Sequence, residues 1–483
     1  MSETKTKAPY KAIHIVITIA LMLFFGLLPA PDPITPLGMK ILGIFIGMVY
    51  GWSTTDQIWP SLFGITMLAV VDYNTVANVI IGGWGNTTIW TIVMILIFAQ
   101  AVSEAGITEY LALRLIGNRF FVGKAWLFTG VIFLSAYLIT AITSNPFIAI
   151  IILWKIVYDV ADVAGYQKKD AWPSMAIFGI VFSAGMGTGA FPHQMIPLMA
   201  FGAYQSMGGP SINYGSYVVV FWGIVLLVTL LYLLICKYVL RIDVEKLSKI
   251  DVSTFSQGTA SLDKRQKVLL ATFVIMVICF FCCNMLPKSW LPIAILNKMG
   301  LAGLSAIFVA IASFLRVDGR PLFDFQKAAS NGVLWSVVLL TSAALPISTA
   351  LTSEGTGVQD FLIAHLGPMF AGKNIMLFAM LASVLALIIT NFASNMVTAL
   401  VFIAVVVSVS GQLGANPTAI VVLLVTMVHV AVLTPAACPM AGMLFANAEW
   451  MNPTFIYKHA GLILVLTAII VCTYGYLTAN LLF

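Results

Sequence analysis

Charged residues are scarce in this 483-residue chain. Asp, Glu, Lys and Arg together make up only 9% of it, whereas apolar types make up 61%. A soluble globular protein carries about 25% charged and about 45–50% apolar residues. This number of charged residues is too small to cover a water-exposed surface. The composition therefore excludes most soluble enzymes. It predicts a polytopic membrane protein that has lipid as its main solvent.

Several motifs are also absent. The chain has no phosphate-binding P-loop and no HExxH pair, and its two membrane-depth histidines have no acidic neighbours, so neither ATP-driven transport nor a metalloenzyme is indicated. Its six cysteines do not predict a disulfide framework or a zinc site, because all but Cys438 lie in plainly apolar runs. The net charge of +6 is typical of Lys and Arg retained in cytoplasmic loops, and we expect no nucleic-acid partner.

What the chain does contain is a series of apolar runs. Runs of about 20 residues predict membrane-spanning helices, and the shorter ones here are assigned by their place in the series. We expect eleven spans, at residues 12–30, 37–51, 58–72, 87–113, 173–203, 215–240, 267–287, 300–315, 331–350, 417–447 and 456–482.

Two further apolar regions, 125–158 and 375–410, are interrupted in the middle by the polar clusters Thr143-Ser144-Asn145-Pro146 and Ala393-Ser394-Asn395-Met396. Each half is too short to span a bilayer comfortably. We expect re-entrant helical hairpins, whose non-helical tips are tolerated at membrane depth only where protein or water covers them.

The distribution of basic residues tests this topology. With the N-terminus in the cytoplasm, all but four of the 24 Lys and Arg residues fall on the cytoplasmic side, the exceptions being Lys40, Lys288, Lys298 and Lys373. This bias supports a multi-pass protein of the cytoplasmic membrane, with a cytoplasmic N-terminus and an external C-terminus.

The two interrupted regions are related by an internal repeat. LITAITSNPF (138–147) aligns with IITNFASNMV (388–397) at an offset of 250, and the halves have opposite predicted orientations. Such inverted repeats are typical of secondary transporters. The expected organisation is an N-terminal segment with the first helix (1–36), a first repeat (37–240) with a broken helix at 173–203, a cytoplasmic linker (241–266), and a second repeat (267–483) with a broken helix at 417–447.

The hairpin tips Ser144-Asn145 and Ser394-Asn395 are the leading candidate site. Ser and Asn also cap helices, so one such pair alone is equally well explained as a helix cap. Two copies in inverted halves favour a binding site, because helix N-termini attract anions and unwound carbonyls suit Na⁺. Thr140 and Thr390 each lie four residues before the tip serine, where a hydroxyl either adds a hard cation ligand or bonds back to its own helix.

Each repeat also contains a span rich in Gly or Pro downstream of its hairpin. The first carries Gly187, Gly189 and Pro192, and the second carries Pro435 and Pro439. These residues either kink a helix or unwind it opposite a hairpin tip, and the matched placement favours unwinding. His193 and His429 near these breaks are either functional or simply held by hydrogen bonds between helices.

These residues resemble the divalent anion:sodium symporter family, the INDY-type di- and tricarboxylate carriers, over nearly the whole chain. The resemblance implies an ion-transporter-superfamily-like fold, a homodimer, and a transport domain that moves against a scaffold as an elevator. It further implies Na⁺ as the coupling ion, a small organic anion, expected to be a di- or tricarboxylate, as substrate, no organic cofactor and no enzymatic activity.

The resemblance also implies site residues. A first Na⁺ site would comprise Thr140, Ser144, Asn145 and backbone carbonyls among Gly187, Gly189 and Ala190. A second would comprise Thr390, Ala393, Asn395 and Ala437. Substrate would lie between the tips, close to Ser144, Asn145, Pro146, Ser394, Asn395, Met396, Pro439 and His193.

The chain departs from the family pattern in both tips. The third tip position, usually Thr, is Pro146 in one and Met396 in the other, so two hydroxyls are missing. Pro146 suits the first turn of a helix, so the positive helix end should survive. The less polar site leaves room for a substrate with a larger apolar part or a single carboxylate.

Rival interpretations remain open at this point. An anion exchanger or an H⁺-coupled carrier would share the architecture, and His193 would be the residue to test for the latter. An intramembrane enzyme would need a nucleophile–base pair or metal ligands at membrane depth. The symmetric Ser-Asn tips do not have the arrangement expected of a catalytic site. A channel would differ in showing no saturation of flux.

Overall fold

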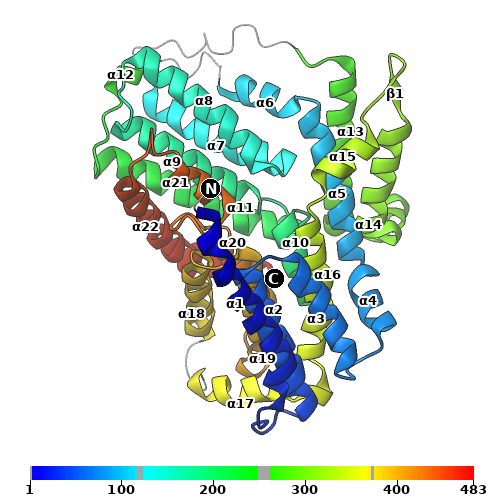
Figure 1. The fold of residues 1–483 in the computed structure, drawn as a ribbon. Helices are drawn as coiled ribbons and strands as arrows, with labels where there is room; N and C mark the ends of the chain where they lie inside the picture. The colour runs from blue at the N-terminus through cyan, green and yellow to red at the C-terminus, as the bar shows by residue number, and fades with distance from the viewer. Residues whose placement is uncertain (1–2, 117–122, 249–260, 371–374) are drawn as a thin grey trace.

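The computed structural model describes residues 3–116, 123–248, 261–370 and 375–483, and most of them are helical (Figure 1). Lys373 and residues 249–260 of the expected linker lie outside the described residues. The only strands in the described part are β1 (Arg316–Val317) and β2 (Arg320–Pro321), which form one antiparallel hairpin.

The first half of the chain forms the helices α1 (Glu3–Phe24), η1 (Phe25–Leu27), α2 (Pro36–Thr54), α3 (Ile58–Val70), α4 (Val76–Trp84), α5 (Thr87–Glu104), α6 (Ile107–Ile116), α7 (Ala125–Thr143), α8 (Pro146–Ala164), α9 (Ala171–Gly187), α10 (Met195–Ser206), α11 (Tyr214–Tyr238) and α12 (Glu245–Ser248).

The second half forms α13 (Lys264–Met285), α14 (Leu291–Phe314), α15 (Phe325–Gly332), α16 (Trp335–Leu351), η4 (Glu354–Thr356), α17 (Val358–Phe370), α18 (Ile375–Thr390), α19 (Asn395–Leu413), α20 (Pro417–Val428), α21 (Pro439–Ala446), α22 (Pro453–Ile470), η5 (Val471–Gly475) and α23 (Tyr476–Leu482).

The all-α membrane architecture predicted from the composition is confirmed. Among the described residues, seven helices are long and apolar enough to cross a membrane, or eight if α15 and α16, bent by 69° at their junction, form one span. The other expected spans are built from shorter apolar helices, such as Ile58–Val70 and Ala171–Gly187. The total of eleven spans therefore stays a prediction.

Some boundaries differ from those expected. The run at 87–113 is divided, because α5 ends at Glu104 and Gly106, at φ +75°, turns the chain into α6. A positive φ is strained for any residue with a Cβ, and glycine removes that strain. The span expected at 300–315 begins earlier, at Leu291, and Gly300 (φ 60°) interrupts it. Helices α4 and α17 were not expected, because neither has the length of a span.

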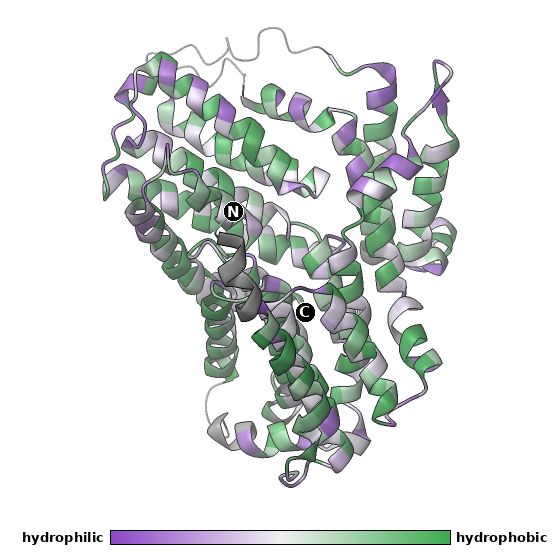
Figure 2. Cartoon of the chain, viewed as in Figure 1, coloured by the Kyte–Doolittle hydropathy of each residue, from purple (hydrophilic) through white to green (hydrophobic). Residues whose placement is uncertain are grey.

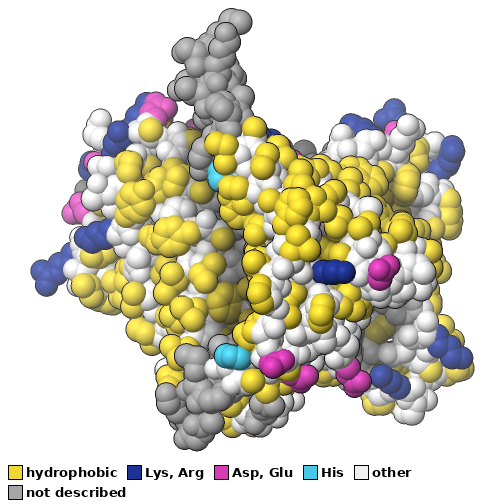
Figure 3. All heavy atoms as spheres, turned by 60° about the horizontal axis from the view of Figure 1, so that its bottom comes forward, with side chains coloured by type: hydrophobic (Ala, Val, Ile, Leu, Met, Phe, Trp, Pro, Cys, Tyr) yellow, Lys and Arg dark blue, Asp and Glu magenta, His cyan; other side chains and the backbone are white. Residues whose placement is uncertain are grey.

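Apolar side chains dominate the surface as well as the interior. Hydrophobic residues run along most helices, and hydrophilic ones gather at helix ends and loops (Figure 2). The space-filling view shows a broad hydrophobic face, with most Lys and Arg near its margins (Figure 3). Large side chains such as Leu226, Leu230 and Ile469 are about half exposed, at 49–53%. Such exposure costs free energy in water and none in lipid, so these faces contact the membrane.

Two apolar cores hold the helices together. The smaller joins α5 to α13 and α14, where Phe98 and Phe273 meet edge to face with centroids 5.3 Å apart. The larger contains helices α7 to α11 and α18 to α22 together with α2, α3 and α16. This larger core surrounds the tips and breaks predicted from the sequence.

Candidate functional site

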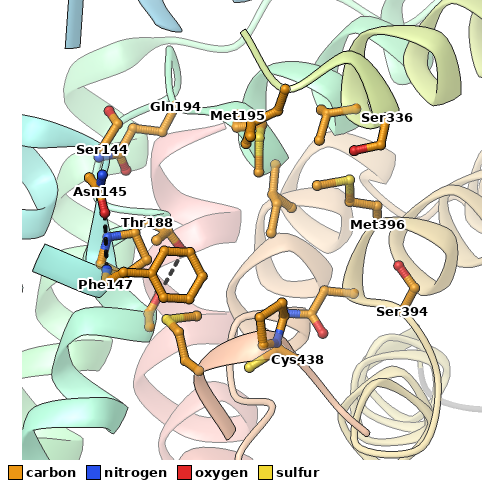
Figure 4. Close-up of a pocket in the computed structure, with 18 of the residues that line it drawn as sticks. Ser144, Asn145, Phe147, Thr188, Gln194, Met195, Ser336, Ser394, Met396 and Cys438 are labelled. Atoms are coloured by element: carbon orange, nitrogen blue, oxygen red, sulfur yellow. Dashed lines mark hydrogen bonds between the residues drawn. The ribbon is translucent and has the colours of Figure 1, made fainter. Parts of the chain in front are cut away.

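The chain is interrupted four times within the larger core. Residues 144–145 separate α7 from α8, and residues 391–394 separate α18 from α19. The longer breaks 188–194 and 429–438 separate α9 from α10 and α20 from α21. Residues from all four interruptions line one cavity of about 730 Å³ (Figure 4).

All residues that the sequence predicted for the substrate line this cavity. They are Ser144, Asn145, Pro146, His193, Ser394, Asn395, Met396 and Pro439. Ser144 and Asn145 face Ser394 and Met396 from opposite sides of it (Figure 4). Among the other residues predicted for Na⁺, Ala393 and Ala437 also line the cavity, whereas Thr140, Gly187, Gly189, Ala190 and Thr390 are buried behind its wall.

The first tip is a fully satisfied helix cap. Ser144 is left-handed at φ 51° and ends α7. The Asn145 Oδ1 atom accepts hydrogen bonds from the Phe147 and Ile148 amides at 3.1 and 3.4 Å, and the Asn145 amide donates to the Thr143 hydroxyl at 3.4 Å. Pro146 occupies the first helical position and has no N–H. The four donors that a helix start usually leaves free are therefore all used or absent.

The second tip is arranged differently. Ser394 precedes α19 without a side-chain cap, so the first amides of α19 remain available. The Thr390 hydroxyl lies 3.0 Å from Asn395 Oδ1 and 3.1 Å from the Val428 carbonyl at the end of α20. The single proton of the Thr390 hydroxyl has two possible acceptors. The oxygens of Thr390, Asn395 and Val428 lie close together, and oxygen atoms of this kind are hard ligands. Sequence reasoning missed Val428, because an apolar side chain does not reveal what its carbonyl does.

Asn391 was also missed, and it holds the second tip to the second break. Its Nδ2 donates to the carbonyls of Leu387 and Val430, both at 2.8 Å. Its Oδ1 accepts from the amides of Val432 and Leu433 at 3.0 and 2.9 Å. The fully buried side chain thus satisfies unwound backbone that would otherwise be left without partners.

In the first repeat, Gln194 connects the first break to α7, much as Asn391 connects the second tip to the second break. Its Nε2 donates to the Ala141 carbonyl of α7 at 3.0 Å, and its Oε1 accepts from the Phe191 amide. Two carbonyls of this break, predicted as Na⁺ ligands, already accept hydrogen bonds. Tyr217 donates its hydroxyl proton to Gly189 O at 2.6 Å, and the Trp222 indole donates to Ala190 O at 2.9 Å. Each carbonyl keeps one lone pair for a cation.

Thr140 and Gly187 are in direct contact. A Cβ built on Gly187 would lie 2.7 Å from both Thr140 Cβ and the Tyr137 carbonyl oxygen, so only glycine fits there. The Thr140 Oγ1 atom is buried and has no hydrogen-bond partner among the described residues. A buried hydroxyl without a partner costs free energy, and this one lies next to the first break.

The second break carries a thiol at the cavity wall. Cys438 donates to the Ala431 carbonyl at 3.1 Å, and its sulfur caps α21 by accepting from the Ala441 amide at 3.4 Å. The neighbouring Met440 of α21 reaches the last turn of α9, where its Cε would lie 3.7 Å from a Cβ on Gly185. The methionine side chain therefore connects α21 to α9 next to the first break.

The two histidines are enclosed in aromatic surroundings. His193 stacks on Phe191 with centroids 5.3 Å apart, and its Nδ1 has no partner among the described residues. His429 keeps its Nδ1 2.6 Å from the Val425 carbonyl and meets Phe221 edge to face. Both also line the cavity, so the sequence placed them correctly but did not define their role.

No charged side chain is among the residues that line the cavity in the described part of the chain. Positive potential there comes instead from helix starts, since α8, α10, α16, α19 and α21 all begin at its wall. The Glu104 carboxylate does not line the cavity but contacts two residues that do. It accepts hydrogen bonds from Gln100 and Asn331 at 3.0 and 2.8 Å, and both of these amides line the cavity.

Comparisons with known proteins agree with this geometry. A family model described as the sodium:sulfate symporter transmembrane region matches residues 10–482. The Na(+)/citrate cotransporter of Mus musculus is 23% identical over 256 residues, which are 47% of this chain and 44% of that protein. The match thus spans less than half of that relative's length.

The fold is also that of a known transporter. The crystal structure of the Alcanivorax borkumensis YdaH transporter, described as having an unusual topology, superposes with a TM-score of 0.56 at 12% identity, covering 96% of this chain and 98% of that one. With the match of the family model over nearly the entire chain, the resemblance inferred from the tips is confirmed. The chain belongs to the sodium:sulfate symporter family, which is a family of membrane transporters and not of enzymes.

Proposed function

We propose that this protein is a secondary active transporter that moves a small organic anion across the cytoplasmic membrane together with Na⁺. The supporting observation is the cavity in which both Ser-Asn tips and both breaks meet, and which no described Lys or Arg lines. An anion there depends on helix starts and bound cations for its charge balance. The resemblance to di- and tricarboxylate carriers makes a carboxylate the first expectation.

Na⁺ binds at two places in this proposal. The second site is centred on the oxygens of Thr390, Asn395 and Val428, with Ala393 and Ala437 beside them. The first lies near Thr140, whose buried hydroxyl has no described partner. A cation at Asn395 stands next to the free amides of α19, so each ion strengthens the binding of the other. Coulomb attraction at about 4 Å is of the order of 4 kcal/mol at an effective dielectric of 20, which is sufficient for coupling.

Transport proceeds by an elevator movement. The tips and breaks form one part of the cavity wall, and residues of α2, α5 and α16 form another, so the substrate lies between two sets of helices. Trp52, Gln57 and Asn331 line the cavity on the side that the charge bias assigns to the cytoplasm. We infer an inward-open state of a homodimer, with an internal N-terminus and an external C-terminus.

A second candidate function is an H⁺-coupled carrier, in which His193 is the residue to test. Its ring lies in the cavity wall with its Nδ1 unpartnered among the described residues. An anion exchanger with the same fold is the other alternative. It differs in needing an internal anion and no cation gradient.

Thermal unfolding of the purified protein in detergent tests the Na⁺ site. Raising NaCl at constant ionic strength, against KCl, should stabilise the protein specifically, by about 2.7 kcal/mol at 100 times the dissociation constant. Thr390→Val should weaken this effect. The control is Thr478→Val in α23, which loses only local bonds to the Tyr474 and Gly475 carbonyls of the preceding η5. Equal stabilisation by Na⁺ and K⁺ would contradict the sodium site.

A further inference from the structure

The two hairpin tips differ in what they offer an anion. At the start of α8, Pro146 lacks an N–H and Asn145 already binds the amides of Phe147 and Ile148. At the start of α19, the amides of the first turn have no side-chain cap. Sequence symmetry between the tips therefore does not extend to their hydrogen-bonding capacity.

A second helix start without a cap lies next to α19. The helix α10 begins at Met195 with no side-chain cap from Gln194, and α10 packs against α19 in the fold. Residues from both helix starts line the cavity. The uncapped amides of α19 and those of Met195 and Ile196 in α10, where Pro197 has no N–H, thus belong to one packed pair of helices. Such an arrangement binds a single carboxylate.

The opposite part of the cavity, around the first tip, combines the polar residues Ser144, Asn145 and Thr188 with large apolar side chains. The Phe147 ring, which is 39% exposed, projects into it beside the first tip (Figure 4). Met440 and Cys438 line the neighbouring wall, and Met440 extends toward Gly185. Methionine side chains adapt their shape and interact well with aromatic rings. A second carboxylate placed here would find the Ser144 hydroxyl and the Asn145 Nδ2 group but no free amide at the start of α8, so its desolvation would be compensated only in part.

We propose that the site selects organic anions with one carboxylate and an apolar, branched or aromatic body, in preference to di- and tricarboxylates. The carboxylate binds between the starts of α10 and α19, and the body lies against Phe147 and Met440. This inference rests on the proposed function, because it assumes that the cavity carries a transported carboxylate. A volume of about 730 Å³ easily accommodates a body of this size.

Uptake into proteoliposomes under a Na⁺ gradient tests the preference, with labelled phenylacetate and labelled succinate as the two probes. The wild-type protein should transport phenylacetate with a kcat/KM at least about 10-fold above that for succinate. Pro146→Thr restores an amide and a hydroxyl at the first tip, and should shift this ratio about 10-fold toward succinate. Should that variant not fold, Met396→Thr adds a hydroxyl at the other tip and should shift the ratio in the same direction.

Asn416 and Pro417 provide a matched control. Asn416 caps α20 by accepting from the amides of Thr418 and Ala419, just as Asn145 caps α8, but neither residue lines the cavity. Pro417→Thr should therefore leave the ratio unchanged. Faster uptake of succinate than of phenylacetate by the wild type would overturn this inference and leave the proposed transporter intact. Uptake of neither acid, by protein shown to be folded, would overturn both.

Discussion

Asn391 binds Val430 across the space between the second tip and the second break, with 2.8 Å between the amide Nδ2 and the carbonyl oxygen. Three further hydrogen bonds from the same side chain reach Leu387, Val432 and Leu433. This side chain is therefore the structural support of the unwound segment that carries Cys438 and Pro439. It positions the site without lining the cavity.

Replacing Asn391 should destabilise the protein more than replacing any exposed asparagine. Asn391→Ala leaves several buried backbone groups unpaired, and each such group costs about 1–3 kcal/mol. Thermal unfolding in detergent measures the loss. The control is Asn480→Ala, because the exposed Asn480 bonds only the Tyr476 carbonyl of its own helix. Equal melting temperatures for the two variants would contradict the supporting role.

Alanine substitutions of the two tip asparagines should have different effects on stability and on Na⁺ dependence. Asn145→Ala removes a helix cap worth about 1 kcal/mol and should lower both stability and uptake. Asn395→Ala removes an oxygen beside Thr390 and should raise the Na⁺ concentration for half-maximal uptake, with a smaller effect on stability. Asn416→Ala, a cap outside the cavity, should lower stability without changing the Na⁺ dependence. An unchanged Na⁺ dependence in Asn395→Ala would argue against this ligand.

Gly187 should tolerate no side chain. In Gly187→Ala the added methyl would overlap Thr140 and the Tyr137 carbonyl, both at 2.7 Å, and would push α7 away from α9. We expect reduced Na⁺-driven uptake and a loss of stability of about 1–3 kcal/mol, typical of overpacking. Gly461→Ala serves as the control, since a Cβ there meets nothing within 4 Å. Wild-type uptake by Gly187→Ala would show that the contact does not matter.

Cys438 should react with thiol reagents from the cytoplasmic side. Its side chain lines the cavity, and the cavity includes Trp52 and Gln57 on the expected inner side. A membrane-impermeant maleimide should label inside-out vesicles faster than right-side-out ones, and bound substrate should slow the labelling. Cys438→Ala identifies the labelled site, because the chain has five other cysteines. Faster labelling from outside would contradict the inward-open state.

Much of this architecture was readable from the sequence, because the relevant residues act through local chemistry. The scarcity of charged residues predicted a membrane protein, and the two Ser-Asn pairs predicted the positions of both hairpin tips. The division of 87–113 at Gly106 was missed, since a single glycine inside an apolar run does not reveal its φ angle. The helices α4 and α17 were missed because they are shorter than a span.

The finer features of the site depend on long-range contacts. Asn145 and Asn395 occupy equivalent positions in the repeat, yet one caps its own helix and the other contacts Thr390. Gln100 and Asn331 are brought to the cavity by Glu104, a relationship between helices far apart in the chain. No local pattern records which backbone amides remain free, and that property decides where an anion binds.

Na⁺-gradient-driven uptake of a labelled carboxylate into proteoliposomes tests the central claim most directly. The panel should include mono-, di- and tricarboxylates, with K⁺ replacing Na⁺ as the paired condition. The account predicts saturable carboxylate uptake that requires external Na⁺ and that needs a higher Na⁺ concentration in Asn395→Ala. Uptake that ignores Na⁺ and instead needs an internal anion would contradict it and make the protein an exchanger.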